Sequence, residues 1–141
     1  MEEKAIRLIE SFCRSFDDKD WNLMSACLQD KIEIDYTSFR ETPVETISSD
    51  QYVELRKTGL KGLSTEHKTS HYNIHEQKGK ILCACAFEIK RYENGTQEFF
   101  HSYGSYEFEL AYEGDTLKIS RIRQIVTHNE GNKNIHGAFR K

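Results

Sequence analysis

The first part of the chain has the three- and four-residue spacing of amphipathic helices. Residues 2–17 carry one apolar stripe, made of Ala5, Ile6, Ile9, Phe12, Cys13 and Phe16. A shorter segment, 20–29, places Trp21, Met24, Cys27 and Leu28 on one face. Ser48 and Gln51 have the Ser-x-x-Gln spacing of a capping box, which predicts a helix from there to about Leu60. The pattern therefore predicts three N-terminal helices.

The spacing then changes to the alternation of strands. Residues 31–39 alternate so that Ile32, Ile34 and Tyr36 face one way. Four longer segments follow after Ser64, at 65–76, 80–92, 97–112 and 116–128. The Asn94-Gly95 pair between two of them is a strong hairpin signal. We expect these segments to form an antiparallel meander to which the strand 31–39 adds, with a loop around Pro43.

Helices followed by strands predict an α+β fold. We expect a cone-shaped α+β barrel, in which three N-terminal helices pack on a strongly curved, mostly antiparallel sheet. A closed all-β barrel would leave no place for the helices. The length of 141 residues suits a single domain over residues 1–141. Its polar tail, 129–141, holds Ile135 and Phe139, so it is expected to be a lid or a flexible tail.

Composition narrows the range of partners. A net charge of −3 without a block of Lys or Arg indicates neither nucleic-acid binding nor attraction to a membrane surface. No apolar run approaches the ~20 residues of a membrane span. The polar start, Met1-Glu2-Glu3-Lys4, is unlike a secretory signal, which predicts a soluble cytoplasmic protein. A small-molecule ligand is the expected partner.

The four cysteines all lie in apolar contexts. Cys83 and Cys85 fall on the same face of one predicted strand, where a disulfide has poor geometry. We interpret Cys13, Cys27, Cys83 and Cys85 as reduced core residues. A metal site at Cys83-x-Cys85 is the alternative, but no second Cys/His pair has zinc-site spacing. We therefore predict neither a metal nor a cofactor.

Three short blocks resemble a known family. Phe-Asp-Asp-Lys-Asp-Trp at 16–21, Ile-Asp-Tyr-Thr-Ser-Phe at 34–39 and Thr-Glu-His at 65–67 are similar to scytalone dehydratase. They are also similar to the wider SnoaL-like group of the nuclear transport factor two-like superfamily. The resemblance extends thinly from residue 12 to residue 127 and implies the curved α+β fold described above.

The resemblance also implies site residues. The dehydratase's tyrosine–aspartate pair falls on Phe16 and Asp17, its strand tyrosine on Tyr36, and its first histidine on His67. Its second histidine falls near Ile89, where this chain has none. Because a phenol and a histidine are missing, scytalone is not expected to be the substrate.

The chemistry of these residues suits proton abstraction next to a carbonyl. Such a reaction needs a base with a pKa near neutrality, a group that fixes the base, and a donor aimed at the developing enolate oxygen. His67 suits the base, Asp17 would orient it and raise its pKa, and Tyr36 would be the donor. The alternatives are structural: Asp17 as a turn or N-cap residue, Tyr36 in the core, and His67 without a catalytic role.

Further candidates come from the strands. His67, Thr69, His71, Asn73 and His75 are expected to share one face, with the pocket rim at its start. His101 is the candidate replacement for the missing histidine, although the more apolar opposite face of its strand argues that it points outward. The remaining candidates are predicted to bind substrate: Phe16, Trp21, Tyr52, His71, Tyr103 and Ser105. Arg121 and Arg123 are expected to be solvated or paired, with contact to an anionic ligand as the alternative.

The sequence leaves three functions open. The first is a cofactor-independent dehydratase or isomerase acting on a small cyclic or polyketide-like molecule. The second is a non-catalytic ligand-binding or association module with the same fold, and the third is the small subunit of a ring-hydroxylating dioxygenase. Tyr72, Tyr92 and other aromatics on the outer face of the meander predict a homo-oligomer, a dimer with a trimer as the alternative.

Overall fold

The α-helices that the structure describes all lie in the N-terminal part of the chain. The computed structural model describes residues 1–139. Its first six elements are α1 (Glu2–Asp17), α2 (Trp21–Ala26), β1 (Leu28–Asp35), α3 (Thr37–Arg40), β2 (Glu45–Ser48) and α4 (Ser49–Gly59). Four long strands and a 3-10 turn follow: β3 (Leu63–Gln77), β4 (Lys80–Glu93), β5 (Phe99–Glu113), β6 (Thr116–Gly131) and η1 (Lys133–Ile135). Within the described residues, no helix has the length and apolar character to cross a membrane.

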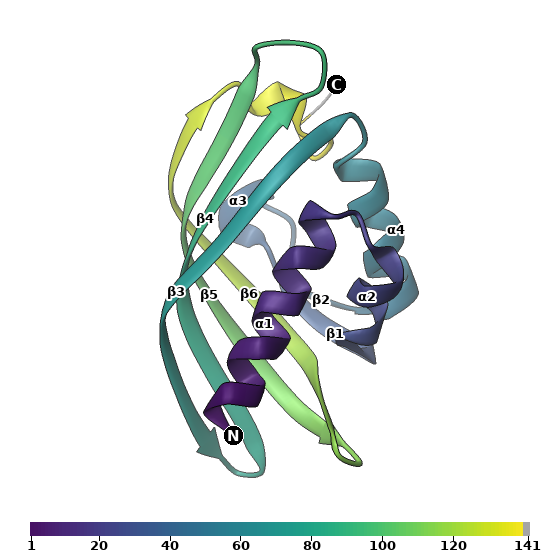
Figure 1. The fold of residues 1–141 in the computed structure, drawn as a ribbon, viewed down its shortest axis with the longest axis vertical. Coiled ribbons are helices and arrows are strands. Elements are labelled where there is room, and N and C mark those ends of the chain that lie inside the picture. Colours follow the sequence, from purple (N-terminus) through teal and green to yellow (C-terminus); the bar gives the residue numbers. More distant parts are fainter. Residues whose placement is uncertain (140–141) are drawn as a thin grey trace.

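The strands form one mixed sheet in the order β2-β1-β6-β5-β4-β3. Every neighbouring pair is antiparallel except β1 and β6, which are parallel. The sheet is strongly curved, and α1, α2 and α4 lie on its concave side (Figure 1). The predicted cone-shaped α+β fold is confirmed, with an open sheet rather than a closed barrel.

Local signals explain where the helices begin. The Asp20 carboxylate accepts a hydrogen bond from the Leu23 N–H at 3.0 Å and caps α2. Ser48 Oγ accepts from the Gln51 N–H at 3.0 Å and caps α4, as the capping box predicts. Asp20, not Asp17, is therefore the N-cap of α2, and the interpretation of Asp17 as that cap is wrong.

Two short elements differ from the sequence prediction. The strand expected over 31–39 ends at Asp35, because the Asp35 carboxylate accepts hydrogen bonds from both the N–H and the hydroxyl of Thr37 and turns the chain into α3. Ser38 Oγ then ties α3 to β6: it donates to the Gln124 carbonyl and accepts from the Val126 N–H. The loop expected around Pro43 contains β2, which pairs with β1.

A β-bulge in β3 reverses which side chains face the helices. Ser70 pairs with Ala86 but Asn73 pairs with Ala84, so β3 contains one extra residue there. His71 adopts a left-handed φ of 56° at this bulge. The prediction that 67, 69, 71, 73 and 75 share one face is therefore wrong. His67 and Thr69 face the helices, whereas beyond the bulge the core contacts are made by Tyr72 and Ile74.

The cysteines belong to the core on the concave side. All four are buried free thiols. Burial raises the pKa of Cys83 to about 11 and that of Cys85 to about 12, so both are protonated near neutral pH. This is the state expected of core residues rather than of thiolate metal ligands.

Candidate functional site

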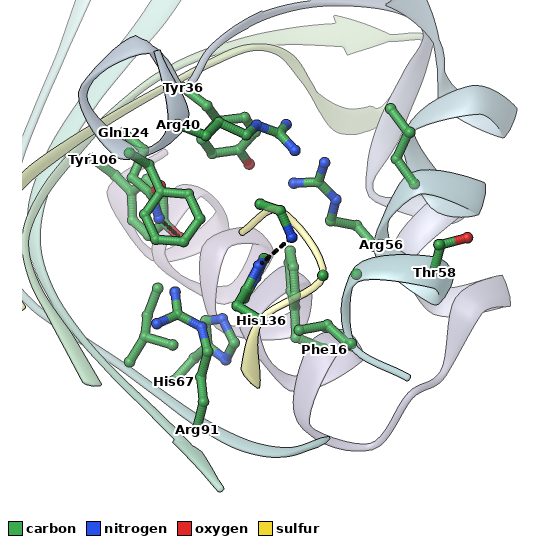
Figure 2. Close-up of a pocket in the computed structure, with 17 residues that line it drawn as sticks. Phe16, Tyr36, Arg40, Arg56, Thr58, His67, Arg91, Tyr106, Gln124 and His136 are labelled. Atoms are coloured by element: carbon green, nitrogen blue, oxygen red, sulfur yellow. Dashed lines mark hydrogen bonds between the residues drawn. The ribbon is translucent and has the colours of Figure 1, made fainter. Parts of the chain in front are cut away.

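A cavity of about 210 Å³ lies between the concave sheet, α3, α4 and the C-terminal tail. Its wall is partly aromatic and apolar, but many polar side chains reach it (Figure 2). The polar and charged residues that line it are Tyr36, Arg40, Arg56, Thr58, His67, Arg91, Tyr106, Gln124 and His136. Residues of α1, α3, α4, the four long strands and the C-terminal tail contribute to this wall.

Asp17 and His67 form a closely hydrogen-bonded pair at the wall. Asp17 is the last residue of α1, and His67 lies on the facing part of β3. Asp17 Oδ1 lies 2.6 Å from His67 Nδ1, and Asp17 Oδ2 accepts from the His67 backbone N–H at 2.9 Å. The hydroxyl of Thr65 also donates to Oδ1, at 2.9 Å. These three donors fix the carboxylate, which in turn fixes the imidazole.

Burial determines the charge of this imidazole. The His67 side chain is 5% exposed, and desolvation lowers the pKa of His67 although Asp17 acts to raise it and Arg91 to lower it. The expectation that Asp17 raises the pKa of His67 above its ordinary value is therefore wrong. A neutral imidazole beside a carboxylate carries its proton on Nδ1, so the lone pair lies on Nε2. His67 is in the state that a general base requires.

Tyr36 lies on the cavity wall, with Tyr52 behind it. Their hydroxyl oxygens are 2.6 Å apart. Tyr52 is completely buried and does not line the cavity, and either hydroxyl of the pair can be the donor. When Tyr52 donates to Tyr36, the hydroxyl proton of Tyr36 is left for the cavity.

Two arginines lie against the ring of Tyr36. The Cζ atoms of Arg40 and Arg56 are 5.0 Å and 5.2 Å from the centroid of this ring. Arg56 is also 4.6 Å from the ring of Tyr52. Figure 2 shows the ends of Arg40 and Arg56 pointing toward one another. Burial and the positive charge of Arg56 lower the pKa of Arg40.

A third arginine lies beside His67. Arg91 is 3% exposed, and burial lowers the pKa of this guanidinium to about 10. Its Nη1 donates to the Phe100 carbonyl at 3.3 Å and to Ser102 Oγ at 2.9 Å. Arg91 is thus a buried cation held by neutral oxygens.

The far wall and the tail complete the cavity. Gln124 Nε2 donates to the Tyr106 hydroxyl at 3.2 Å, and Gln124 Oε1 is buried without a partner among the described residues. The tail returns over the cavity: the Gly137 N–H donates to the Gly59 carbonyl at 3.1 Å, and His136 reaches the wall. Of the predicted lid or tail segment 129–141, residues 136–138 line the cavity, whereas 129–131 belong to the end of β6. Its last two residues are outside the described part.

Sequence comparison identifies the family. The profile of the SnoaL-like domain matches residues 2–123. This chain belongs to the SnoaL-like domain family. Among proteins of curated function, none matches it in sequence.

Solved structures share the fold of this SnoaL-like domain. The Kfla4162 protein of Kribbella flavida is 16% identical with a TM-score of 0.87, covering 97% of this chain and 95% of that one. A candidate scytalone dehydratase of Novosphingobium aromaticivorans is 15% identical with a TM-score of 0.76, covering 93% and 87%. A type 2 hexachlorocyclohexane dehydrochlorinase (LinA) is 12% identical with a TM-score of 0.78, covering 96% and 90%.

The fold of this SnoaL-like domain brings together some of the residues expected at the site. Phe16, Tyr36 and His67 line the cavity, and Asp17 holds His67 from behind. The Phe16 ring lies 4.7 Å from the imidazole of His67. Tyr52 does not line the cavity, because it lies behind Tyr36.

The other candidates lie outside the cavity. Trp21 packs against the core from α2 and does not line the cavity. His101, Tyr103 and Ser105 alternate with the buried residues of β5, so they face outward, and the prediction that His101 replaces a pocket histidine is wrong. His71 is exposed at the bulge. A wide open depression beside the bulge touches His71, Tyr103 and Ser105, which do not line the cavity. It also touches Asp17, and it shares His67 with the cavity.

Several cavity residues were missed at the sequence level. Arg91 has a recognisable signal, because it occupies an inward position in the alternation of β4 after Phe87 and Ile89. Arg56 lies three and four residues after the buried Val53 and Tyr52, on the inner side of α4. Arg40 and His136 have no comparable signal, since α3 and the tail have no regular apolar spacing.

Proposed function

We propose that this protein is a cofactor-independent lyase or isomerase that removes a proton next to a carbonyl group of a small molecule. One observation carries the proposal: a neutral, carboxylate-held imidazole and a phenol line the same cavity. The pair supplies the base and the phenol supplies a donor for the oxygen on which charge develops. The dimensions of the cavity suit a small ligand.

The first step uses His67 and Tyr36. His67 Nε2 takes the proton from the carbon next to the carbonyl, and the electron pair of that C–H bond forms a carbon–carbon double bond. The carbonyl π-electrons move to oxygen, where the Tyr36 hydroxyl donates a hydrogen bond to the enolate. Asp17 stabilises the imidazolium that results, as its position against Nδ1 allows.

The second step returns the proton from His67. In an isomerisation the proton goes to another carbon of the enolate, which regenerates the carbonyl. In a dehydration the enolate electrons expel a hydroxyl group at the β-carbon, and this group leaves as water with the proton from Nε2. Dehydratase and dehydrochlorinase, the activities named for two proteins of the same fold, are both eliminations, which supports the second route.

Deuterium exchange tests the proposal without knowledge of the substrate. In heavy water the wild-type protein should catalyse exchange of the α-protons of cyclohexanone, measured by proton NMR. His67→Ala should abolish the exchange. His75→Ala is the matched control, because this exposed histidine lies on the same strand beyond the bulge, and it should exchange as the wild type does. Equal rates in all three proteins and in buffer would contradict catalysis.

A ligand-binding module is the second candidate function. Phe16 favours it, because a side chain without a hydroxyl replaces one of the two phenols that the dehydratase resemblance implies. Such a module would bind a ligand in the same cavity and accelerate no exchange. A wild-type protein that binds carbonyl compounds but leaves their α-protons unexchanged would support the module over the enzyme.

A further inference from the structure

The cavity is positively charged although the chain is not. The whole sequence carries a net charge of −3. Among the described residues that line the cavity there are three arginines, Arg40, Arg56 and Arg91, and no Asp or Glu. A concave wall with charge of one sign attracts a ligand of the opposite sign.

Two arginines outside the cavity, Arg121 and Arg123, are paired with carboxylates. Arg121 Nε forms an ion pair with Glu33 Oε2. Arg123 lies 3.5 Å from Asp35 and 3.3 Å from Glu107. The prediction that these two are paired is confirmed, and they serve as an internal reference for the cavity arginines.

Arg40 and Arg56 lack such partners within residues 1–139. No carboxylate of the described residues lies within 4.0 Å of either guanidinium, and Glu45 acts on Arg40 only as the weakest of its charge interactions. Arg40 Nε and Arg56 Nη2 are buried and find no acceptor there. Two neighbouring cations with unsatisfied donors are unfavourable unless an anion joins them.

We propose that Arg40 and Arg56 bind the carboxylate group of the ligand. Both guanidinium side chains line the cavity without a carboxylate partner among the described residues, and guanidinium groups bind carboxylates through charge-assisted hydrogen bonds. The Tyr36 ring, which lies within 5.2 Å of both Cζ atoms, holds the two cations in place while the site is empty.

The size of the cavity limits the rest of the ligand. An apolar cavity of roughly 150 Å³ accommodates benzene, so about 210 Å³ leaves room for one ring or a short chain with a small polar group. The ligand class is therefore a small carboxylic acid with a single ring or an open chain.

The position of His67 gives this ligand an orientation, a step that rests on the proposed function. Figure 2 shows Arg40 and Arg56 on one side of the cavity and His67 with Arg91 on the other. A ligand held by its carboxylate between Arg40 and Arg56 directs its opposite end toward the imidazole. The reacting carbon would thus be remote from the carboxylate.

Calorimetric titration with benzoate tests the inference, with benzamide as the neutral match. The wild-type protein should bind benzoate more tightly than benzamide. Arg40→Gln and Arg56→Gln should each lower the affinity for benzoate by about tenfold or more. The affinity for benzamide should stay unchanged. Arg121→Gln, which removes a paired arginine outside the cavity, should bind benzoate as the wild type does.

Several outcomes would overturn the carboxylate site. These are equal binding of benzoate and benzamide, no binding of benzoate at millimolar concentration, or tighter binding of phenyl phosphate than of benzoate. Loss of affinity in Arg121→Gln equal to that in the cavity variants would also overturn it. Circular dichroism checks that each variant folds. Arg56→Lys is a second variant, which keeps the positive charge but loses the planar guanidinium that can donate two parallel hydrogen bonds. It should lower the affinity for benzoate less than Arg56→Gln does.

The His67→Ala variant separates this inference from the proposed function. It should still bind benzoate more tightly than benzamide, because the imidazole is not part of the arginine pair. If it also fails to catalyse exchange, both proposals stand. If the wild type binds benzoate through Arg40 and Arg56 but no protein catalyses exchange, the carboxylate site stands and the catalytic proposal fails.

Discussion

Asp17 and His67 are joined by two hydrogen bonds, one from the imidazole and one from the backbone of the same residue. The carboxylate therefore fixes both the ring and the strand that carries it. This double contact gives Asp17 two separable effects, on the orientation of the base and on the attachment of α1 to β3.

Asp17→Asn should impair both the orientation of His67 and the attachment of α1 to β3. An asparagine amide nitrogen cannot accept a hydrogen bond, so one of the donors from Thr65 and His67 loses its acceptor, and the tautomer of His67 is no longer specified. We expect activity to fall by about two to four orders of magnitude and unfolding free energy by about 1–3 kcal/mol. Asp20→Asn is the control, since asparagine caps helices as well as aspartate does. Wild-type turnover in Asp17→Asn would argue against orientation of a base.

Tyr36→Phe and Tyr52→Phe form a matched pair. Each removes one hydroxyl of the same 2.6 Å hydrogen bond, but only Tyr36 lines the cavity. Tyr36→Phe should lower kcat by about one to three orders of magnitude, the range for one donor to an enolate oxygen. Tyr52→Phe should lower it much less, because the Tyr36 hydroxyl remains. Similar losses in both variants would mean that the phenols act as a structural pair.

Turnover should depend on pH through His67. The base is active when neutral, so kcat/KM should be constant at neutral pH and decrease as the pH falls through the pKa of His67, which lies below 6.5. The rate profile in wild type and in His75→Ala should show the same acidic limb. A limb above pH 6.5 would contradict the lowered pKa.

The unfolding free energy should also depend on pH through His67. The unfolded chain binds a proton at the ordinary histidine pKa near 6.5, whereas folded His67 resists it. Unfolding free energy should therefore decrease as the pH falls from 6.5 toward the lowered pKa, and His67→Gln should reduce this dependence. Urea titrations over that range measure it. An unchanged slope in His67→Gln would assign the effect to other groups.

Gly137→Ala should disturb the tail. A Cβ at residue 137 would lie 2.7 Å from Gly59 Cα, which is closer than real contacts allow, whereas a Cβ at residue 59 would meet only His136 Cε1 at 3.7 Å. We expect Gly137→Ala to lose about 1–3 kcal/mol or to release the tail, and Gly59→Ala to be tolerated. Melting temperature and amide exchange at Ala138 distinguish the two variants. Equal tolerance would mean that the tail is not held by this contact.

Self-association stays a prediction with a better-defined surface. Tyr72 faces the core and no longer supports it, but Tyr92 and Phe99 are 42% and 39% exposed, and the His101 ring lies within 5.2 Å of both. We expect a dimer through this face and a monomer after Tyr92→Glu with Phe99→Glu. Tyr112→Glu, at another exposed aromatic, is the control. Light scattering that gives 16.5 kDa for the wild type would refute the dimer.

Elements whose signals are local could be predicted from the amino-acid sequence alone. These are the apolar stripe of α1, the cap at Ser48 and the alternation of the four long strands. Each depends on neighbours within a few residues, so it can be recognised in the sequence. The alternation of 31–39 grouped Tyr36 with Ile32 and Ile34, although the strand ends at Asp35, and the family resemblance supplied His67. The family resemblance added Asp17, whose pairing no local pattern specifies.

Features that depend on contacts between distant segments become visible only in the folded chain. One extra residue in β3 reversed the direction of every side chain after Ser70, because the strand period is two and a bulge leaves no mark in composition. The parallel pairing of β1 with β6 is of the same kind. Arg40, Arg56 and Arg91 come from α3, α4 and β4, and only the fold brings these three segments to one cavity. Their positive charges gather there because the wall is built from segments that are distant in the sequence, and no Asp or Glu of the described residues lines it.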